Sequence, residues 1–342
     1  MKSLNIGFLG TGWIASTYAK ALAKLPDVRI TALCNRHVER ALKFNTDYAG
    51  GHAECYDDFD KMMAMESMDA LFVCITPGSH DGQVEEAAAR GIHLVLEKPI
   101  ALTQQRADSI EAAVTKAGVH CQIGHHMRHS GPARKLKQMI DDGSAGRPLM
   151  MQGRFFVNGL FPTWWRDPKI GGGQLVEQSI HCYDLARYFF GDAKTVVGFK
   201  DKLTHERFAD YHVDDASAAT ILFKNRGIAS LCASNCADPT KGSTLFSVAC
   251  EKVYVEFRSP DEAEFVMHSG QVGDEIADKN AVPREIVKTE GPTAYEELAR
   301  NFIAAIQGKE KTRSTVRDGV EGLRLVLAVA KSSDEGGMPQ AV

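Results

Sequence analysis

The sequence has no long apolar run, no basic tract and no cysteine framework. Among its 342 residues, no apolar segment approaches the ~20 residues that a membrane-spanning helix needs. Lys and Arg number 40 against 44 Asp and Glu, with the two signs interspersed, so nucleic acid is not an expected partner. The apolar stretch at residues 4–9 is short and is stopped by glycines, which favours a strand over a signal peptide. These features predict a soluble, cytoplasmic protein.

The eight cysteines are scattered, and several lie inside apolar runs. Disulfide frameworks belong mainly to small secreted domains, so we expect reduced core thiols. Cys232 and Cys236 lie four residues apart, but no second pair completes a zinc-finger spacing. His125, His126 and His129 have no carboxylate or thiolate nearby at ligand spacing, and no metal is expected.

The first third of the chain alternates short apolar strands with helices. Strands are expected at residues 4–9, 28–34, 70–75, 92–96 and 119–123, and helices at 13–24, 38–48, 85–90 and 103–116. Buried strands separated by helices are typical of a parallel sheet with helices on both faces. We therefore predict an α/β fold class, with a doubly wound dinucleotide-binding (Rossmann) domain over residues 1–123.

The rest of the chain, residues 124–342, forms the expected second domain, in keeping with roughly 150 residues per domain. Its expected strands follow one another without intervening helices, which favours an antiparallel or mixed sheet in an α+β arrangement. These strands lie at residues 149–157, 195–200, 217–223, 228–232, 244–249 and 253–257, and the expected helices at 174–190, 293–307 and 316–331.

The segment Gly10–Ala15 reads G-T-G-W-I-A and fits the pattern G-x-G-x-x-G/A between a strand and a helix. Gly10 permits the tight turn, Gly12 lets the backbone approach a pyrophosphate, and Ala15 keeps helix and strand close. The helix N-terminus supplies partial positive charge. The context predicts a dinucleotide site that includes Gly10, Gly12, Trp13, Ile14 and Ala15; the alternative is a glycine turn without a ligand.

The second expected strand ends at Asn35 and Arg36. An acidic residue at this place normally accepts hydrogen bonds from the ribose of NAD. Asn35 lacks the charge that would repel a 2′-phosphate, and Arg36 has the chemistry to pair with one. The pair favours NADP over NAD, although Arg36 also suits stacking on the adenine.

Two further segments carry chemistry. Glu97-Lys98-Pro99 ends a parallel strand, at the edge where open α/β sheets bind ligands, and an ammonium there suits the oxygen of a reacting carbon. Glu177, His181 and Asp184 follow three glycines and, on a helix, share one face. Histidine has a pKa suited to proton exchange near neutrality. The alternatives are a surface lysine and a solvated polar stripe.

In combination, these motifs resemble the glucose–fructose oxidoreductase/inositol dehydrogenase (Gfo/Idh/MocA) family, from Leu4 to about Ala330. The resemblance is carried, in order, by Gly10–Ala15, Glu97-Lys98-Pro99, Trp165-Arg166 before Gly171-Gly172-Gly173, and Glu177, His181 and Asp184. It implies a Rossmann domain followed by an α/β domain with a large open, mostly antiparallel sheet that commonly mediates homodimers or homotetramers. The helix at about 316–331 would return to the first domain.

The resemblance also implies roles for individual residues. Lys98 would contact the reacting hydroxyl, His181 would be the general acid/base, and Glu177, where the family usually has Asp, would bind substrate and orient the histidine. His125 and Arg128 would be further substrate contacts. Residues implied to contact the cofactor are Thr76, Pro77, His80, Glu97, Lys98, Trp165 and Arg166.

The expected activity is an NAD(P)-dependent dehydrogenase or reductase acting on a CH–OH group of a sugar, sugar derivative or cyclitol. The cofactor supplies the redox chemistry, and the protein supplies position and electrostatics. Two alternatives stay open: a redox-neutral glycosidase that uses bound NAD, and a non-catalytic dinucleotide sensor. Loss of Lys98 or His181 would indicate the sensor, and both residues are present.

Overall fold

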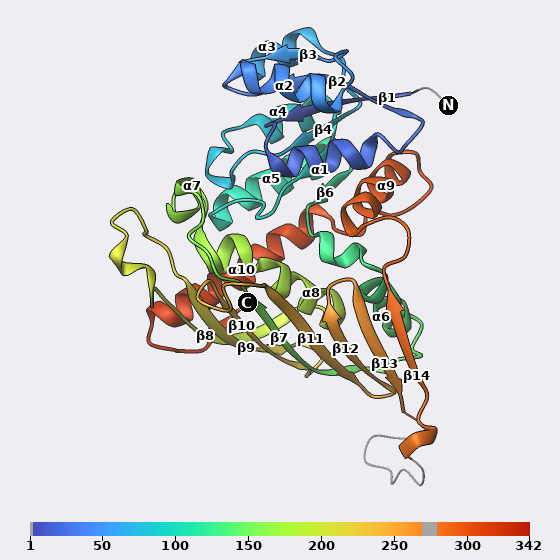
Figure 1. The fold of residues 1–342 in the computed structure, drawn as a ribbon, viewed down its shortest axis with the longest axis vertical. Helices are drawn as coiled ribbons and strands as arrows, with labels where there is room; N and C mark the ends of the chain where they lie inside the picture. The colour runs from blue at the N-terminus through green and yellow to red at the C-terminus, as the bar shows by residue number, and fades with distance from the viewer. Residues whose placement is uncertain (1–2, 269–278) are drawn as a thin grey trace. The chain divides into compact units, whose positions relative to one another are not determined.

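The computed structural model describes residues 3–268 and 279–342. The chain forms two compact units, coloured along the chain in Figure 1. The first comprises residues up to His125 together with Tyr295–Val320, and the second comprises His126–Ala294 together with Glu321–Val342. Each unit has its own sheet, and each is described separately below.

The first unit contains a six-stranded sheet of order β3-β2-β1-β4-β5-β6, in which all neighbouring strands are parallel. The central strands are apolar and buried on both faces, as helices on both sides require. This confirms the predicted Rossmann sheet; the short β3 was not expected. The strands are β1 (Leu4–Leu9), β2 (Val28–Cys34), β3 (Glu54–Tyr56), β4 (Ala70–Val73), β5 (His93–Leu96) and β6 (Cys121–Ile123).

Among the helices of the first unit, α5 (Gln104–Ala117) has ordinary capping signals at both ends. The Thr103 side chain accepts a hydrogen bond from the Arg106 backbone N–H at the start of α5, and Gly118, with φ +66°, ends that helix. Late in the chain, α9 adds Leu298 and Phe302 to the same core. The helices are α1 (Trp13–Leu22), α2 (Val38–Tyr48), α3 (Phe59–Met65), α4 (Gln83–Ala89), α5 (Gln104–Ala117) and α9 (Ala294–Ile306), with a 3₁₀ turn η1 (Pro77–Ser79).

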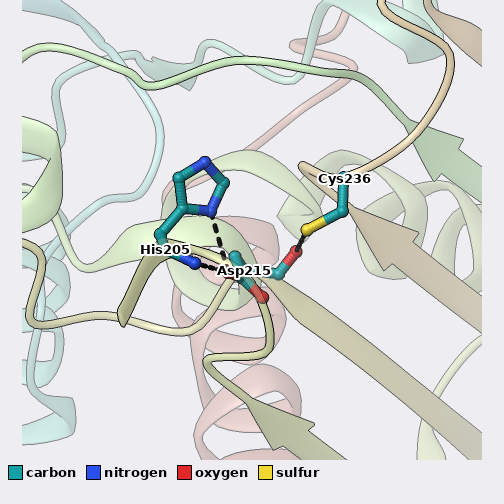
Figure 2. A group of neighbouring side chains, drawn as sticks. All are labelled: His205, Asp215 and Cys236. Carbon is teal, nitrogen blue, oxygen red and sulfur yellow. Dashed lines mark hydrogen bonds and ion pairs between the residues drawn. The ribbon is translucent and has the colours of Figure 1, made fainter. Parts of the chain in front are cut away.

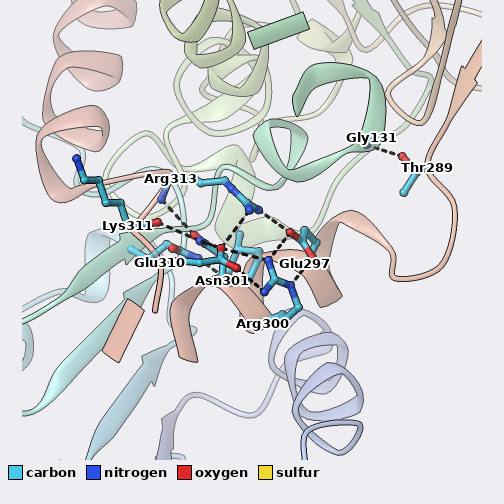
Figure 3. A network of polar contacts seen from close by, with 10 residues as sticks. Gly131, Thr289, Glu297, Arg300, Asn301, Glu310, Lys311 and Arg313 are labelled. Atoms are coloured by element: carbon cyan, nitrogen blue, oxygen red, sulfur yellow. Dashed lines mark hydrogen bonds and ion pairs between the residues drawn. The ribbon is translucent and has the colours of Figure 1, made fainter. Parts of the chain in front are cut away.

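A polar network on α9 holds the segment that follows this helix (Figure 3). Glu297 accepts hydrogen bonds from Arg300 Nε at 2.7 Å and from Arg313 Nη1 at 2.6 Å, and both arginines also pair with Glu310. Asn301 donates to Glu310 at 2.8 Å. Burial would raise the pKa of Glu297, but the hydrogen bonds from the two arginines outweigh it and lower that pKa to about 2.

The second unit is built on a nine-stranded sheet of order β14-β13-β12-β11-β7-β10-β9-β8-β15. Only β7 and β10 pair in parallel among its described strands, which confirms a mostly antiparallel sheet. Strands β13 to β15 were not expected. The strands are β7 (Pro148–Phe156), β8 (Ala193–Asp201), β9 (Ala216–Phe223), β10 (Ile228–Ser234), β11 (Ser243–Cys250), β12 (Val253–Ser259), β13 (Glu262–Met267), β14 (Arg284–Lys288) and β15 (Gln340–Ala341).

The helical segments of the second unit pack on the sheet, and α8 contacts β7 and β10. They are α6 (Gly131–Asp141), α7 (Thr163–Arg166) and α8 (Ile180–Phe190), the 3₁₀ turns η2 (His126–His129), η4 (His205–Arg207) and η5 (Lys279–Ala281), and the π-helical turn η3 (Gln174–Gln178). The last helix, α10 (Val316–Asp334), contributes its residues from Glu321 onward to this unit.

The single helix expected over residues 174–190 is divided in the structure. Ser179 N–H donates to Gln174 O at 2.8 Å, a five-residue step that defines the π-turn, and α8 begins at Ile180. Gly173 starts the turn with φ +78°, and a Cβ there would lie 2.4 Å from Val213. The close approach of the neighbouring loop explains why the start of this helix departs from regular geometry. Such π-turns are frequent at functional sites.

No helix in the described residues is long and apolar enough to cross a membrane. All eight cysteines are free thiols.

Candidate functional site

The glycine turn of the first unit leaves open space beside Gly12. Gly10 has φ +91°, and a Cβ there would lie 2.5 Å from Cys74 O, so the turn requires glycine. A Cβ on Gly12 would meet no atom within 4 Å. Gly12 caps α1 without a side-chain hydrogen bond, so the helix N-terminus adjoins open space. This arrangement fits an anionic group held by backbone amides.

At the end of β2, Asn35 supports the glycine turn. Its Nδ2 donates to Thr11 Oγ1 at 2.7 Å, and its Oδ1 accepts from His37 N at 3.0 Å. Arg36 is exposed beside it, and Trp13 is 75% exposed at the start of α1. The residues that we predict to bind the phosphates and the ribose of the cofactor therefore lie together, at the carboxyl ends of β1 and β2.

The loop after β4 carries Thr76, Pro77 and His80. Thr76 Oγ1 lies 2.7 Å from Ser79 Oγ within the short η1 turn. Burial, and then the positive charge of Arg106, lower the pKa of His80 to about 4. Its imidazole is therefore neutral near pH 7.

Glu97 anchors the residue that follows β5. Tyr18 Oη, from α1, donates to Glu97 Oε1 at 2.6 Å, and Lys98 N–H donates to Glu97 Oε2 at 3.2 Å. Burial, and then the charge of Glu97, raise the pKa of Tyr18, which keeps this hydroxyl protonated. A Cβ on Gly124 would lie 2.5 Å from the carboxylate, so that residue must also be small. The Lys98–Pro99 peptide bond is cis.

In the second unit, α8 presents His181 and Asp184. His181 is 5% exposed, and its ring meets the His126 ring edge-on, with centroids 4.5 Å apart. Asp184 is paired with Arg128 through Nε–Oδ2 and Nη2–Oδ1 distances of 2.8 and 2.7 Å. Both side chains are almost fully buried, at 1% and 3% exposure. The predicted substrate contact Arg128 thus has a structural partner that residue spacing did not reveal.

The segment before the π-turn carries Trp165 and Arg166. Trp165 Nε1 donates to Glu177 Oε2 at 2.8 Å, and its ring stacks on Phe161 with centroids 4.7 Å apart. Arg166 donates from Nε to Phe161 O at 2.5 Å and pairs with Asp210 at 2.6 Å. The sequence did not reveal the tryptophan–glutamate hydrogen bond, because only the fold brings these side chains together.

One group of possible metal ligands stands out among the described residues. Ligand atoms of His205, Asp215 and Cys236 lie within 4.8 Å of one another (Figure 2). Asp215 Oδ2 already accepts hydrogen bonds from Thr204 N, His205 N and His205 Nδ1, at 3.0, 3.0 and 2.8 Å. A cation would have to displace these donors. We interpret the cluster as a hydrogen-bonded turn between β8 and β9.

A glycine turn between β1 and the N-terminus of α1 indicates the class of dinucleotide-binding Rossmann proteins. Family models agree with this class over nearly the whole chain. Residues 4–125 match the oxidoreductase family with an NAD-binding Rossmann fold, and residues 137–341 match its C-terminal α/β domain. The chain belongs to the Gfo/Idh/MocA oxidoreductase family.

Individual relatives are distant but cover the full length. An uncharacterized oxidoreductase, YrbE, of Bacillus subtilis (strain 168) is 26% identical, over 100% of this chain and 97% of the relative. A 1,5-anhydro-D-fructose reductase of Ensifer adhaerens is 25% identical, over 96% of each chain. A solved levoglucosan dehydrogenase, in complex with NADH and levoglucosan, has a similar fold, with a TM-score of 0.88, 20% identity and 100% coverage of both chains.

Proposed function

We propose that this oxidoreductase uses NAD(P) to oxidise or reduce a CH–OH carbon of a sugar, sugar derivative or cyclitol. The proposal rests on the open space beside Gly12 at the start of α1, in a chain of this family. The chain also has Lys98 directly after β5 and His181 on α8. A relative named 1,5-anhydro-D-fructose reductase and a similar structure of a levoglucosan dehydrogenase support a sugar or sugar derivative as the substrate.

Each residue receives a defined task in this proposal. A nicotinamide cofactor, when bound, would supply the hydride chemistry at the substrate carbon. In oxidation, His181 takes the hydroxyl proton, and Lys98 stabilises the negative charge that develops on the oxygen. Glu177 binds the substrate and orients His181, with His125 and Arg128 as further substrate contacts. The proposed cofactor contacts are Gly10, Gly12, Trp13, Ile14, Ala15, Asn35, Arg36, Thr76, Pro77, His80, Glu97, Lys98, Trp165 and Arg166.

The proposal includes a preference for NADP. Asn35 is neutral and is engaged by Thr11 and His37, so it presents no charge to repel a 2′-phosphate. The exposed Arg36 beside it suits such a phosphate. An absorbance screen for reduced nicotinamide, with both cofactors against sugars, aldonates and inositols, tests substrate class and cofactor together. Strong preference for NAD would contradict the assignment of Asn35 and Arg36.

The proposal also includes a homodimer or homotetramer formed through the sheet of the second unit. Strand register places Leu222, Ile228 and Met150 side by side on three neighbouring strands. They are 37%, 43% and 53% exposed, so this face has apolar surface for a partner to cover. Light scattering of the wild type and of Ile228→Lys tests it; a wild-type monomer contradicts it.

Two further parts of the proposal concern location and domain division. The free thiols of all eight cysteines support a cytoplasmic location. We propose that residues 1–123 bind the dinucleotide and that residues 124–342 supply the substrate-binding domain. In the structure, Tyr295–Val320 belong to the first compact unit, and α10 from Glu321 onward belongs to the second.

Replacing Lys98 tests the proposed chemistry. We expect Lys98→Met to lower kcat by about 10²–10³-fold, because a charge on the reacting oxygen would lose its stabilising ammonium. Dinucleotide affinity, measured by fluorescence titration, should stay within about threefold of wild type. Lys116→Met, in the last turn of α5, is the matched control and should retain full activity. Unchanged turnover in Lys98→Met would remove the role assigned to this residue.

Replacing Gly12 tests whether the glycine turn at the start of α1 binds the diphosphate of the cofactor. The residue has φ −81° and nothing near its Cβ position, so Gly12→Ala should change the melting temperature little. The methyl group would occupy the space assigned to the diphosphate, and we expect dinucleotide affinity to fall at least about tenfold. Thr17→Ala, one turn further along α1, should bind normally. Normal binding by Gly12→Ala would contradict the assigned position of the cofactor.

A further inference from the structure

The hydrogen bond between Trp165 and Glu177 joins two segments that the fold holds independently. Its length is 2.8 Å, and the Trp165 side chain is buried, with the residue 2% exposed. An indole has a single N–H donor, so its direction is determined once the ring is fixed. The geometry of the contact therefore depends on what fixes the ring and on what fixes the glutamate.

Trp165 is fixed through both its backbone and its ring. Its N–H donates to Pro162 O at 2.9 Å in the short helix α7. A Cβ on Gly171 would lie 2.6 Å from Trp165 Cα, so the loop after α7 passes directly against it. The ring stacks on Phe161 and also lies near Tyr211, at 6.3 Å between centroids. The indole N–H thus has little freedom to turn away from Glu177.

The π-turn that carries Glu177 is fixed from the opposite side. Leu175 N–H donates to Asp214 Oδ2 at 2.8 Å, and Ser217 Oγ donates to the side chain of Gln174 at 2.9 Å. Gly173 lies against Val213. With both backbones held, the length of the glutamate side chain determines whether its carboxylate reaches the indole nitrogen.

We propose that Trp165 is a positioning residue that directs the carboxylate of Glu177 toward the substrate. This inference rests on the proposed function, in which Glu177 binds substrate and orients His181. A carboxylate accepts about four hydrogen bonds, so the indole orients one oxygen while the group keeps capacity for a substrate hydroxyl. Shortening the side chain in Glu177→Asp would withdraw the carboxylate from the indole.

Nuclear magnetic resonance tests the contact without any need for activity. In the dinucleotide-free protein, the side-chain N–H signal of Trp165 should report its hydrogen bond to Glu177. It should move upfield in Glu177→Ala and in Glu177→Asp, while the indole signals of Trp13 and Trp164 stay in place. A Trp165 signal insensitive to both variants would overturn the proposal.

A double-mutant cycle tests the positioning role. We expect Trp165→Phe to lower kcat/KM for the sugar about tenfold to hundredfold, which corresponds to the loss of a hydrogen bond to a charged group. In a Glu177→Ala background the same change should have less than about a twofold effect. Equal losses in both backgrounds would mean that Trp165 acts only through packing and would overturn the proposal.

Two controls distinguish positioning from packing and from direct contact with the cofactor. Phe161→Leu removes the stacked ring but keeps the indole N–H, so it should lower the melting temperature while kcat/KM stays within about threefold of wild type. If contact with the cofactor were the whole role of Trp165, Trp165→Phe would weaken dinucleotide binding without changing kcat or KM for the sugar, and this result would overturn the positioning role. A wild type that oxidises no polyol at all would contradict the proposed function, and the resonance experiment would still decide the contact.

Discussion

Two regions of the molecule hold buried carboxylates in different ways. On α9 of the first unit, Glu297 is surrounded by the guanidinium groups of Arg300 and Arg313 (Figure 3). In the turn between β8 and β9 of the second unit, Asp215 is held by the backbone N–H groups of Leu203, Thr204 and His205. Figure 2 shows the contacts from His205. Both pKa values are lowered to about 2, although burial alone would raise them.

The residue that precedes Asp215 shows what makes the difference. Asp214 accepts a hydrogen bond from Leu175 N–H at 2.8 Å, and burial raises its pKa to about 6. Asp214 and Asp215 are adjacent in the chain, yet their pKa values move in opposite directions. For Asp215 the hydrogen bonds donated to the carboxylate outweigh burial, whereas for Asp214 burial outweighs them, and this balance decides whether the group stays charged.

The largest expected effect is at Asp215. Asp215→Asn replaces an acceptor oxygen by an amide N–H₂, which leaves buried backbone donors unsatisfied, and should destabilise the protein by about 3 kcal/mol at pH 7. Because the native pKa is lowered, this stabilisation is present above about pH 4 and is lost between pH 4 and 2. Urea unfolding at pH 7 and at about pH 2.5 measures the stabilisation and its loss.

Two controls accompany that measurement. Cys236→Ser should change stability by less than about 0.5 kcal/mol, since the thiol contributes no donor to the carboxylate in our interpretation. Addition of zinc or of a chelator should leave the melting temperature unchanged. A melting temperature that rises with zinc would show that the cluster is a metal site after all.

An intermediate effect is expected at Glu297. Glu297→Gln removes the charge that pairs with two arginines and should cost about 2 kcal/mol at pH 7. The lowered pKa places the loss of this stabilisation between about pH 4.5 and pH 2, so the difference from wild type should shrink below pH 4.5. Glu310→Gln contacts the same arginines from a more exposed position and should cost less than about 1 kcal/mol. Equal losses of stability in Glu297→Gln and Glu310→Gln would contradict the larger contribution that we assign to the buried Glu297.

The smallest expected effect is at Asp214, where we expect a substitution to raise the stability of the protein rather than lower it. Asp214→Asn keeps an oxygen for Leu175 N–H but cannot ionise. Since the native pKa is raised, wild-type stability is present below about pH 4 and is lost as the pH rises through about 6. The side chain is partly exposed, so we expect a gain of about 1 kcal/mol at pH 8 and none at pH 4. A stability gain of the same size at pH 8 and at pH 4 would contradict this expectation.

Local patterns predicted the first unit well. Its strands are apolar because they are buried on both faces, and glycines mark its turns and helix ends. The bounds of β1, β2 and α2 are the ones predicted from the apolar and helical patterns. The segments β3 and α3 were missed, since a three-residue strand and a Met-rich helix carry little periodic signal.

The second unit was less predictable. Helix α6 and strands β13 and β14 were missed, and the π-turn before α8 was expected to be regular helix. Each of these depends on neighbours far along the chain, such as Val213 against Gly173 and Thr289 against Gly131 (Figure 3). Single-sequence spacing has no information about such contacts.

The amino-acid sequence by itself determined the Rossmann topology, the family and the candidate residues, because turn glycines, strand-end lysines and helical spacings are properties of short segments. Tertiary structure alone decided which side chains meet. Arg128 pairs with Asp184, which lies 56 residues further along the chain. Trp165 donates a hydrogen bond to Glu177, which lies in a π-helical turn rather than in a regular α-helix. Hydrogen bonds depend on distances of a few ångströms, and only the packed chain sets those distances.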